Sequence, residues 1–437
     1  MASRLTAIPP GQGPEGKEGA PRTPDSLEET GIDAEFLSAL ALKIAFHELQ
    51  CTTQKVADEM CLPLGITDQI MQALRREHLV SLTAQLGEMN HRYQILDRGL
   101  ERVRRLYEVS GYEGPAPVSL DSYASWMKRQ SKGESKVTPQ WVHDVLSPLV
   151  LPEPTISALG LSVSSRRSLF LTGPPGNGKT TIAQLLHEMN VGDIWIPYAI
   201  EVGGQVITIF DPHTHKPVNR DDLPSWIDRR WVRIRRPLVM VGGELTIEAM
   251  DLTYSPNLRY YEAPFQLKAN GGTLLIDDFG RQRIDPNDLV NRWIVPLEHG
   301  VDFLTLATGM KVEFPFNQLL IFSTNLNPEK IVDAAFARRL GYRVLVKPPT
   351  EPEYRKIFER YAKGRGLEVS QEEIDYLLSL YRSDNRELRG SEPRDLVERV
   401  MDIKSYEPDN TYSMKELLDK AWFNYFGDPN WGATGGS

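Results

Sequence analysis

Apolar residues recur at two different spacings along the chain, and these spacings predict where helices and strands form. Between residues 31 and 112, three stretches have helical spacing, two shorter ones alternate like strands, and a last stretch is again helical. In chain order these six elements are expected at 35–49, 52–62, 66–79, 79–85, 91–97 and 98–110. Thr52 precedes the second helix and is expected to cap it. The first part of the chain therefore predicts a small helical domain with one β-hairpin.

The order and lengths of these elements resemble a winged helix-turn-helix module. In such modules the third helix lies in the major groove of DNA. Asp68 is expected at the exposed start of that helix, where a phosphate backbone would repel it. Basic residues nearby would offset this repulsion, namely Arg75, Arg76, His91 and Arg92. Two alternatives stay open, a module that binds DNA and a module that docks a protein.

A short buried strand is expected at 169–171, and a phosphate-binding loop follows it directly. The loop matches the pattern G-x-x-x-x-G-K-[ST], and the residues after it continue with helical periodicity. The nucleotide-binding residues expected there are Gly173, Pro174, Pro175, Gly176, Asn177, Gly178, Lys179, Thr180 and Thr181. A strand, a glycine-rich loop and a helix in this order predict a nucleotide site rather than a plain turn.

The residue types in this loop fit the chemistry of a nucleoside triphosphate. Its glycines let the backbone approach the phosphates, because they carry no Cβ and tolerate positive φ. The loop N–H groups and the helix N-terminus present partial positive charge to an anion. Lys179 is expected to reach the β- and γ-phosphates, and the Thr180 hydroxyl is expected to bind Mg²⁺. ATP and Mg²⁺ are therefore the expected cofactors.

A second buried strand ends in two carboxylates. Residues 274–276 predict a strand buried on both faces, as in a parallel sheet, and Asp277 and Asp278 follow it. Ligands of open α/β sheets bind at the carboxyl ends of strands. Asp277 is expected to hold Mg²⁺ with Thr180, and Asp278 to polarise the attacking water. The alternative is a pair of turn aspartates, which the upstream phosphate loop disfavours.

These two motifs resemble those of the AAA+ ATPases, and the resemblance extends over about 137–426. The segment LLIFSTN, 319–325, resembles the sensor 1 strand of that family, which implies that Thr324 and Asn325 lie near the γ-phosphate. The second acidic position of the family is most often Glu. Asp278 holds its carboxylate one methylene closer to the backbone, which leaves ATP binding as expected and makes fast turnover an open question.

Two further segments resemble arginine sites of the same family. The stretch AAFARRLGY resembles the arginine-finger segment, which implies Arg339 as the finger and Arg338 as its substitute. Such fingers act on the ATP of the neighbouring subunit, so the resemblance implies a homo-oligomer, in the form of a hexameric ring. The stretch GSEPRDLVERV resembles sensor 2 and implies Arg394.

The position of Arg394 supports the sensor 2 interpretation on independent grounds. Ser391 is expected to cap a helix, so Arg394 falls in the first turn, where the helix dipole disfavours a cation. An external anion such as a phosphate would compensate this cation. The alternative is an ion pair with Glu392 or Asp395.

Two β-hairpins are expected inside the nucleotide-binding region. One turns at Gly203-Gly204 and the other, within 301–316, turns at Thr308-Gly309. Two such insertions resemble the group of AAA+ proteins that includes MoxR-like ATPases and magnesium chelatase subunits. The stretch FQLKANGGTLLIDD is similar to bacterial enhancer-binding activators, although their loop signature is absent.

In those activators an upstream insertion carries a loop that touches the substrate, and its counterpart here is Met250–Pro264. Tyr254, Tyr260 and Tyr261 are its candidate pore-loop residues, with aromatic packing under a hairpin as the alternative. His213 and His215 are expected to form a turn rather than a metal site, because no Cys or further His accompanies them.

Composition limits the class of protein. Hydrophobic residues make up 41% and charged residues 25% of the 437 positions, as in soluble globular proteins. A net charge of −9 gives no strong attraction to nucleic acid or anionic membranes, although a local basic patch stays open. Two cysteines indicate a reducing compartment. Without a signal peptide or a long apolar stretch, we expect a cytoplasmic protein with no membrane insertion.

The predicted fold class is α/β, with a P-loop parallel sheet and a helical lid, preceded by a winged-helix domain. The expected division is a disordered tail, a winged-helix domain, a linker, an ATPase core with hairpin insertions, a helical lid and a flexible tail, at 1–30, 31–112, 113–136, 137–348, 349–426 and 427–437.

The leading functional hypothesis is an AAA+ ATPase that hydrolyses ATP to ADP and phosphate and remodels a macromolecular partner, expected to be a protein. Two alternatives remain. One is a DNA-binding regulator that uses ATP to assemble on its site, and the other is a nucleotide-gated scaffold that hydrolyses ATP very slowly.

Overall fold

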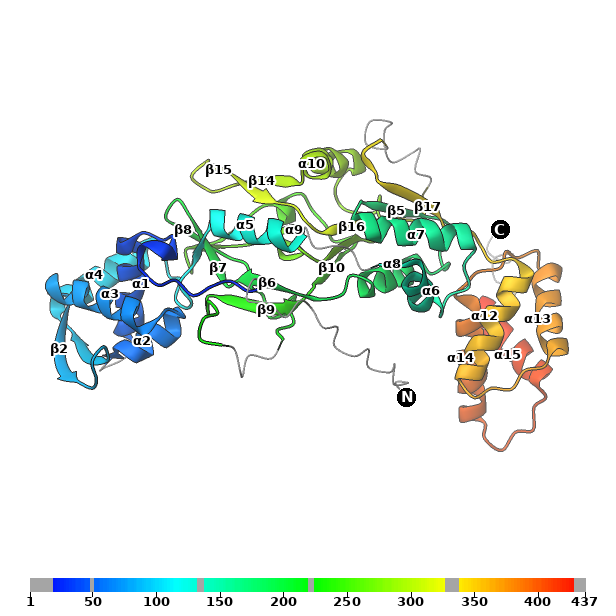
Figure 1. Cartoon of the computed structure of the whole chain (residues 1–437). Coiled ribbons are helices and arrows are strands. Elements are labelled where there is room, and N and C mark those ends of the chain that lie inside the picture. The colour runs from blue at the N-terminus through cyan, green and yellow to red at the C-terminus, as the bar shows by residue number, and fades with distance from the viewer. Residues whose placement is uncertain (1–18, 48–50, 132–136, 219–223, 327–337, 428–437) are drawn as a thin grey trace, which may run out of the picture. The chain divides into compact units, whose positions relative to one another are not determined.

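The computed structural model describes residues 19–47, 51–131, 137–218, 224–326 and 338–427 (Figure 1). The chain divides into two compact units. The first comprises residues 1–134, 190–275 and 288–320, and the second comprises residues 135–189, 276–287 and 321–437. Among the described residues, no helix has both the length and the apolar character that a membrane crossing requires.

Most of the strands belong to the first unit or begin in it. Its helices are α1 (Ala34–Phe46), α2 (Thr53–Met60), α3 (Leu64–Arg76), α4 (Asp97–Val109), α5 (Leu120–Ser131), α9 (Phe265–Lys268) and most of α10 (Pro286–His299). Its strands are β1 (Cys51–Thr52), β2 (Val80–Gln85), β3 (His91–Ile95), β4 (Val118–Ser119), β6 (Asp193–Pro197), β7 (Ala199–Val202), β8 (Gln205–Thr208), β9 (Trp231–Arg235), β10 (Leu238–Val241), β11 (Thr253–Ser255), β12 (Tyr260–Glu262), most of β13 (Thr273–Ile276), β14 (Val301–Thr305) and β15 (Lys311–Pro315).

The second unit is mainly helical. Its described helices are α6 (Pro139–Leu146), α7 (Glu153–Ser165), α8 (Lys179–Glu188), α12 (Glu351–Gly364), α13 (Gln371–Ser383), α14 (Glu392–Tyr406) and α15 (Met414–Phe426). Its strands are β5 (Leu169–Thr172), β17 (Tyr342–Leu345) and most of β16 (Leu319–Thr324).

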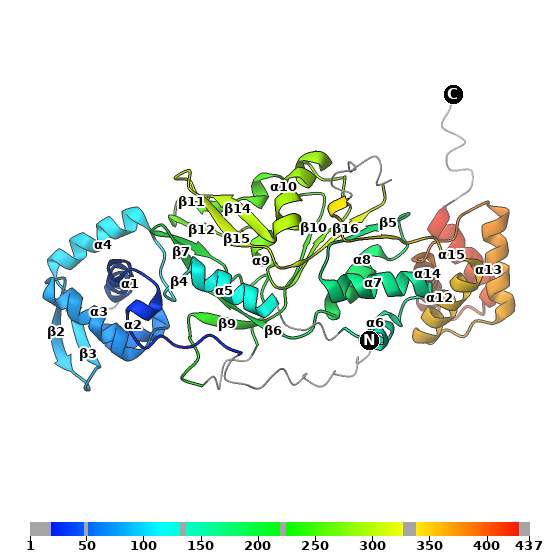
Figure 2. The same ribbon diagram turned by 45° about the horizontal axis from the view of Figure 1, so that its top comes forward.

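The six elements predicted for the N-terminal module are all present, in the predicted order and within a few residues of the predicted ends. The Thr52 hydroxyl accepts a hydrogen bond from Lys55 N at 3.2 Å, which confirms the predicted cap of α2. Strands β2 and β3 form an antiparallel hairpin that extends beside α3 (Figure 2), and β1 pairs with the other edge of β3. Apolar faces of α1–α4 meet in one core around Leu37, Val56 and Tyr93.

Asp68 departs from its predicted exposure. Its side chain is buried, accepts a hydrogen bond from Gln72 Nε2 at 2.6 Å, and lies 3.6 Å from His91 Nε2. The prediction was wrong because the β-hairpin folds His91 against α3, a contact that helical periodicity does not reveal. The charge that would repel a phosphate backbone is therefore not on the surface of this helix.

The segment 113–136, predicted as a linker with room for a short helix, contains helix α5 and also strand β4. Strand β4 pairs in parallel with β7, and the side chains of Tyr123 and Met127 in α5 are fully buried. Asn270 Nδ2 donates to the Tyr123 hydroxyl at 2.9 Å, so that the buried phenol has a partner. Residues 113–131 are therefore an integral part of the first unit.

The segment predicted as a disordered tail is ordered in part. Residues 1–18 lie outside the described residues, but Arg22 forms a β-bridge with Ile227, and Thr23 N donates to Trp226 O at 2.9 Å. Proline and glycine content in this segment concealed these backbone contacts, which depend on residues two hundred positions away.

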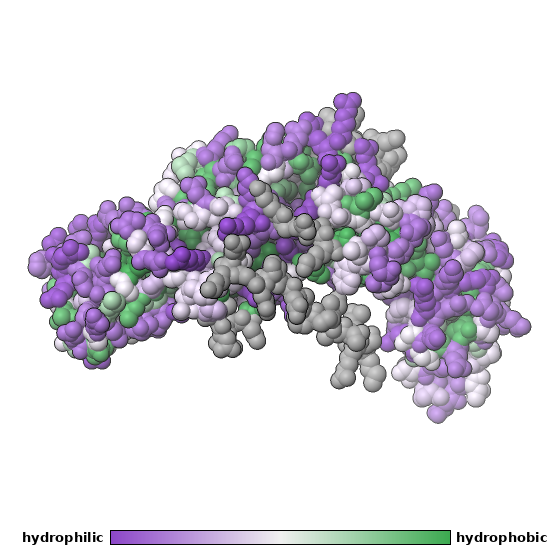
Figure 3. All heavy atoms as spheres, in the orientation of Figure 1, coloured by the Kyte–Doolittle hydropathy of each residue, from purple (hydrophilic) through white to green (hydrophobic). Residues whose placement is uncertain are grey.

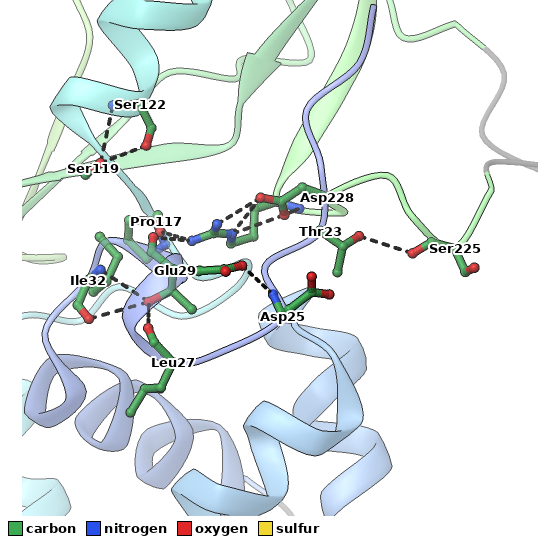
Figure 4. A network of polar contacts seen from close by, with 12 residues as sticks. Thr23, Asp25, Leu27, Glu29, Ile32, Pro117, Ser119, Ser122, Ser225 and Asp228 are labelled. Carbon is green, nitrogen blue, oxygen red and sulfur yellow. Dashed lines mark hydrogen bonds and ion pairs between the residues drawn. The ribbon is translucent and has the colours of Figure 1, made fainter. Parts of the chain in front are cut away.

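A buried ion pair fastens three distant segments of the first unit together (Figure 4). The Arg230 guanidinium pairs with Asp228 at 2.8 Å, and both side chains are at most 5% exposed. Its Nη1 donates to Thr30 O at 3.0 Å and to Pro117 O at 3.2 Å. The N-terminal segment, the approach to β4 and the start of β9 are therefore joined through one side chain.

Both predicted hairpin insertions are confirmed. Strands β7 and β8 pair antiparallel around Gly203-Gly204, and β14 and β15 pair antiparallel around Thr308-Gly309. The first hairpin belongs to a five-stranded sheet of order β11-β12-β8-β7-β4. Ala199 and Val206 of this sheet join the core of the N-terminal module.

Packing accounts for two of the three candidate pore-loop tyrosines. The Tyr261 ring is buried and its hydroxyl accepts from Ala307 N at 2.8 Å, and Tyr260 packs edge-on against buried Tyr112. Tyr254 alone is exposed, to 40%. For Tyr260 and Tyr261 the alternative of aromatic packing under a hairpin describes the structure.

Parallel strand pairing establishes the α/β class. The central sheet has the order β10-β13-β16-β5-β17, and both β16 and β17 run parallel to β5. All four residues of β5 and all six of β16 are buried, as expected for strands covered on both faces. Helices α12–α15 have a separate apolar core, and we call them the lid.

The ion pair of Arg230 generates a stability prediction. Arg230→Met should lower the free energy of unfolding by about 3–5 kcal/mol, because it leaves the buried Asp228 carboxylate without its partner. Arg229→Met is the matched control, since the Arg229 guanidinium forms an exposed pair with Asp58 worth at most about 1 kcal/mol. Denaturant unfolding of the full chain measures both. Equal losses would contradict the role assigned to Arg230.

Candidate functional site

The predicted phosphate loop connects β5 to α8 within the second unit. Gly173 has a φ of 140°, and a Cβ at this position would lie 2.1 Å from Val346 O, so only glycine fits. Gly178, with a φ of 81°, is the N-cap of α8. The first backbone hydrogen bond of this helix runs from Ile182 N to Gly178 O, at 2.8 Å. The N–H groups of residues 179–181 precede it, as at any helix N-terminus, and are available to an anion.

Lys179 is buried at the start of α8, and its ammonium group is held by oxygen atoms. Nζ donates to Gly173 O at 2.8 Å, to Pro174 O at 3.0 Å and to Asn325 Oδ1. Burial lowers the pKa of Lys179, while the carboxylates of Asp277 and Asp278 oppose this shift. The lysine charge is thus held at the loop, close enough to Asp277 and Asp278 for both carboxylates to stabilise it.

The predicted metal ligands lie together. Thr180 Oγ1 donates to Asp277 Oδ2 at 2.8 Å, and Asp277 Oδ1 accepts from Asp278 N at 3.0 Å. A hydroxyl and a carboxylate oxygen are hard donors, which Mg²⁺ prefers, and magnesium sites commonly use few protein ligands plus phosphate oxygens. This donor set fits Mg²⁺ bound with a nucleotide.

Asp278 adopts a left-handed backbone conformation with a φ of 48°, which Asp tolerates better than most residues. Its Oδ1 accepts from Asn325 Nδ2 at 3.0 Å, so Asn325 bridges Lys179 and Asp278. Gln282 Nε2 donates to Asp277 O at 2.9 Å and to Asp278 O at 3.2 Å. Gln282 thereby holds the turn that presents both carboxylates, a role without any signal in the sequence.

Thr324 differs from its predicted place. It is fully buried, its hydroxyl donates to Phe279 O at 2.6 Å, and the same oxygen accepts from Leu326 N at 3.1 Å. Side chains alternate across a strand, so Thr324 and Asn325 cannot both face the loop. Asn325 meets Lys179, whereas Thr324 ties β16 to the turn after Asp278.

The start of α14 lies against the phosphate loop. Ser391 N donates to Gly176 O at 2.7 Å, and Gly390 N donates to Asn177 Oδ1 at 3.1 Å. Asn177 Nδ2 is buried, and no hydrogen-bond partner for it occurs in the described parts of the chain. The segment that resembles sensor 2 therefore touches the predicted nucleotide loop through its backbone.

Arg394 does not reach this loop. Its guanidinium is exposed and pairs with Asp395, with Nε donating to Oδ1 at 2.9 Å, which is the alternative that the sequence left open. Pro393 lies in the first turn after Ser391, but the Ser391 hydroxyl does not form the expected capping hydrogen bond. Arg389 lies nearer, because a Cβ on Gly176 would be 3.7 Å from Arg389 Cδ. Sequence reasoning missed Arg389.

The remaining predicted residues are accounted for separately. Pro175 and Thr181 are exposed on the loop and on the first turn of α8. Residues 334–337 of the predicted arginine-finger segment lie outside the described residues; Arg338 is exposed and Arg339 is half-buried just before β17. The finger assignment stays a prediction.

His215 belongs to a hydrogen-bonded turn. Its Nδ1 accepts from Asp211 N at 3.0 Å, its Nε2 lies 2.9 Å from Lys268 O, and burial lowers the pKa of the imidazole. Within the described segments, no group of three or more His, Cys, Asp or Glu side chains is arranged to hold a metal.

Comparisons with known proteins match the chain in part. A family model described as a domain of unknown function (DUF8689) matches residues 350–424, which form the lid. No curated protein matches the sequence. The chain is similar to the structure of NtrX from Brucella abortus in complex with ADP, at 15% identity and a TM-score of 0.39, over 74% of this chain and 65% of that chain.

A second similar structure is a mutant of Thermotoga maritima RuvB, at 14% identity and a TM-score of 0.35, over 67% of this chain and 72% of that chain. Of the NtrX structure, the chain spans 65% of the length. Neither likeness bears on the activity of this chain, and its α/β class rests on the parallel strands.

The arrangement brings one ammonium, two carboxylates, one hydroxyl and one amide together beside a helix N-terminus. The ammonium and the free N–H groups suit a polyphosphate, and the hydroxyl and a carboxylate suit the divalent cation that accompanies it. The second carboxylate, of Asp278, is held beside them by its hydrogen bond from Asn325.

Proposed function

We propose that this chain is a P-loop ATPase of the AAA+ kind that hydrolyses ATP to ADP and phosphate. The observation that carries the proposal is the bridge from Lys179 Nζ through the Asn325 amide to Asp278, with Thr180 and Asp277 joined beside it. A capping cluster of aspartates would not require a buried lysine at its centre. The glycine-rich loop and the N–H groups at the start of α8, which precede its first intrahelical hydrogen bond, support a phosphate ligand at the same place.

Each side chain has a definite role in this proposal. Lys179 would bind the β- and γ-phosphates, and Thr180 and Asp277 would hold Mg²⁺, which neutralises charge on the phosphates. Asp278 would accept the proton of the attacking water, and Asn325 orients the Asp278 carboxylate through its Nδ2. Arg389, at the loop, replaces Arg394 as the proposed lid cation.

The proposed assembly is a ring, in which Arg339 acts on the nucleotide of the neighbouring subunit. The support is the resemblance of its segment to the arginine finger and its position directly before β17. ATP hydrolysis in such a ring would drive the remodelling of a macromolecular partner.

A protein is the partner we propose for the N-terminal module. Three large apolar side chains of the β2–β3 hairpin are exposed: Leu82, Leu86 and Met89, at 37–48%. Figure 3 shows hydrophobic residues among the hydrophilic surface at this end of the module. An apolar hairpin suits a protein surface better than a phosphate backbone, whose binding depends on basic residues. ATPase stimulation by duplex DNA would favour the alternative of a DNA-bound regulator.

A slowly hydrolysing scaffold is the second candidate function, and the geometry of Asp278 favours it. The short carboxylate is held by a hydrogen bond from Asn325, and its left-handed backbone restricts how far it can advance. Tight ATP binding with turnover near zero in assembled protein would support this candidate.

Lys179→Ala should abolish ATP binding, because it removes the charge that meets the β- and γ-phosphates. Titration with a fluorescent ATP analogue measures the loss. Lys356→Ala, which removes an exposed lysine from α12, is the control and should bind as the parental chain does. Unchanged affinity in the Lys179 variant would reject the nucleotide site.

Asp278→Asn should retain ATP binding and slow hydrolysis by about 10²–10⁴-fold, because an amide cannot accept the proton of water. Asn also tolerates the left-handed conformation, so the fold is preserved. Phosphate release at saturating ATP is the measurement, with Asp402→Asn on the lid surface as the control. Hydrolysis at the parental rate would exclude Asp278 as the base.

Mixing two inactive variants tests the arginine finger. Arg339→Ala has an intact nucleotide site without a finger, and Lys179→Ala has a finger without a site. A finger supplied in trans is worth about 10³–10⁵ in kcat, so mixed rings should regain part of the parental activity. If the two variants co-assemble and the mixture stays inactive, Arg339 does not act in trans.

A further inference from the structure

A buried carboxylate lies in the lid, outside the residues that the proposed reaction uses. Glu392 begins α14 and is 2% exposed. Its Oε2 accepts two hydrogen bonds, from the Tyr381 hydroxyl at 2.8 Å and from Arg389 N at 3.1 Å. The Tyr381 hydroxyl in turn lies 2.9 Å from the hydroxyl of buried Tyr354. Two tyrosines of the lid core thus lead to one glutamate.

Burial of the Glu392 carboxyl lowers the stability of the lid. No ion pair of Glu392 occurs among the described residues, and burial raises the pKa of its carboxyl, against the smaller effects of its hydrogen bonds and of Arg389 and Arg386. Burying a carboxyl without a paired cation is unfavourable, and an apolar side chain of the same size would fill the space at lower cost. The oxygen atom must therefore be important for something other than packing.

The hydrogen bonds of three consecutive N–H groups, those of residues 389–391, indicate the role of Glu392 Oε2. Arg389 N points to Glu392, whereas the next two, Gly390 N and Ser391 N, donate to Asn177 Oδ1 and Gly176 O of the phosphate loop. The direction of each N–H group depends on the peptide planes beside it. Fixing Arg389 N therefore fixes the direction of the two groups that meet the loop.

We propose that Glu392 is a positioning residue for nucleotide binding: its Oε2 orients the turn 389–391, and this turn supports the phosphate loop at Gly176 and Asn177. The proposal rests on the proposed function, because the loop it supports is the proposed ATP site. The same turn carries the Arg389 side chain to the loop, so Glu392 also controls where this cation lies. Tyr381 connects the Glu392 oxygen to the interior of the lid.

Two substitutions that preserve the side-chain volume test the effect of the Glu392 oxygen separately from the effect of packing. Glu392→Gln keeps one carbonyl oxygen, which can accept both hydrogen bonds, and should bind ATP as the parental chain does. Glu392→Met keeps the volume and loses the oxygen, and should weaken ATP binding by about tenfold. Titration of the full chain with a fluorescent ATP analogue measures both.

Tyr354→Phe is the matched control for a general disturbance of the lid. It removes a buried hydroxyl from the same core and leaves both hydrogen bonds of Glu392 in place. Its unfolding temperature should fall, while its affinity for ATP stays at the parental value. Glu392→Asp keeps the carboxylate but shortens it by one methylene, out of reach of Arg389 N, and should weaken binding even if the Met variant does not fold.

Parental affinity in folded Glu392→Met or in Glu392→Asp would overturn the positioning role, as would a loss in Glu392→Gln equal to that of the Met variant. Lys179→Ala distinguishes a failure of the positioning role of Glu392 from a failure of the proposed nucleotide site. If the parental chain binds ATP and Lys179→Ala does not, the proposed function stands whatever the Glu392 variants show. A parental chain that binds no nucleotide refutes the proposed function and this role together.

Discussion

The parallel pairing of β5 with β16 is the constraint on which the candidate site depends. The register places Thr172 opposite Thr324, so the chain leaves both strands at the same level. Gly173 and Asn325 are the next residues, and Lys179, folded back onto Gly173 O, meets the Asn325 amide there. A shift of this register by one residue would turn Asn325 away from the loop, because side chains alternate across a strand.

Two polar networks keep distant segments in place, and they act in different ways. In the first unit, Arg230 neutralises Asp228 and satisfies two carbonyl groups, and it thereby joins the N-terminal segment and the approach to β4 to the start of β9. In the second unit, Glu392 forms no ion pair within the described part of the chain, and it accepts a hydrogen bond from the backbone turn at Arg389 N. The first network stabilises the fold. The second includes a buried carboxyl that destabilises the lid, and we therefore infer that its turn serves a ligand.

Sequence patterns predicted those parts of the protein in which neighbours along the chain also determine the contacts. The helices and hairpin of the N-terminal module, the two insertions and the β5–loop–α8 segment follow from local periodicity and from glycine at positions of positive φ. The proximity of Thr180 and Asp277 was also predictable, because ligand-binding groups of an open α/β sheet gather at the carboxyl ends of its strands.

Tertiary structure alone decided the contacts between residues far apart in the chain. Asp68 lies against His91, the Tyr261 hydroxyl accepts from Ala307 N, and residues 21–23 bond to a segment about two hundred positions away. The arginine at the phosphate loop is Arg389 rather than Arg394, because Asp395 holds the latter on the surface. The sequence by itself determined which elements form and what chemistry they carry, since both depend on local residue types. Which side chains meet depended on the packing of whole elements, and no local pattern records it.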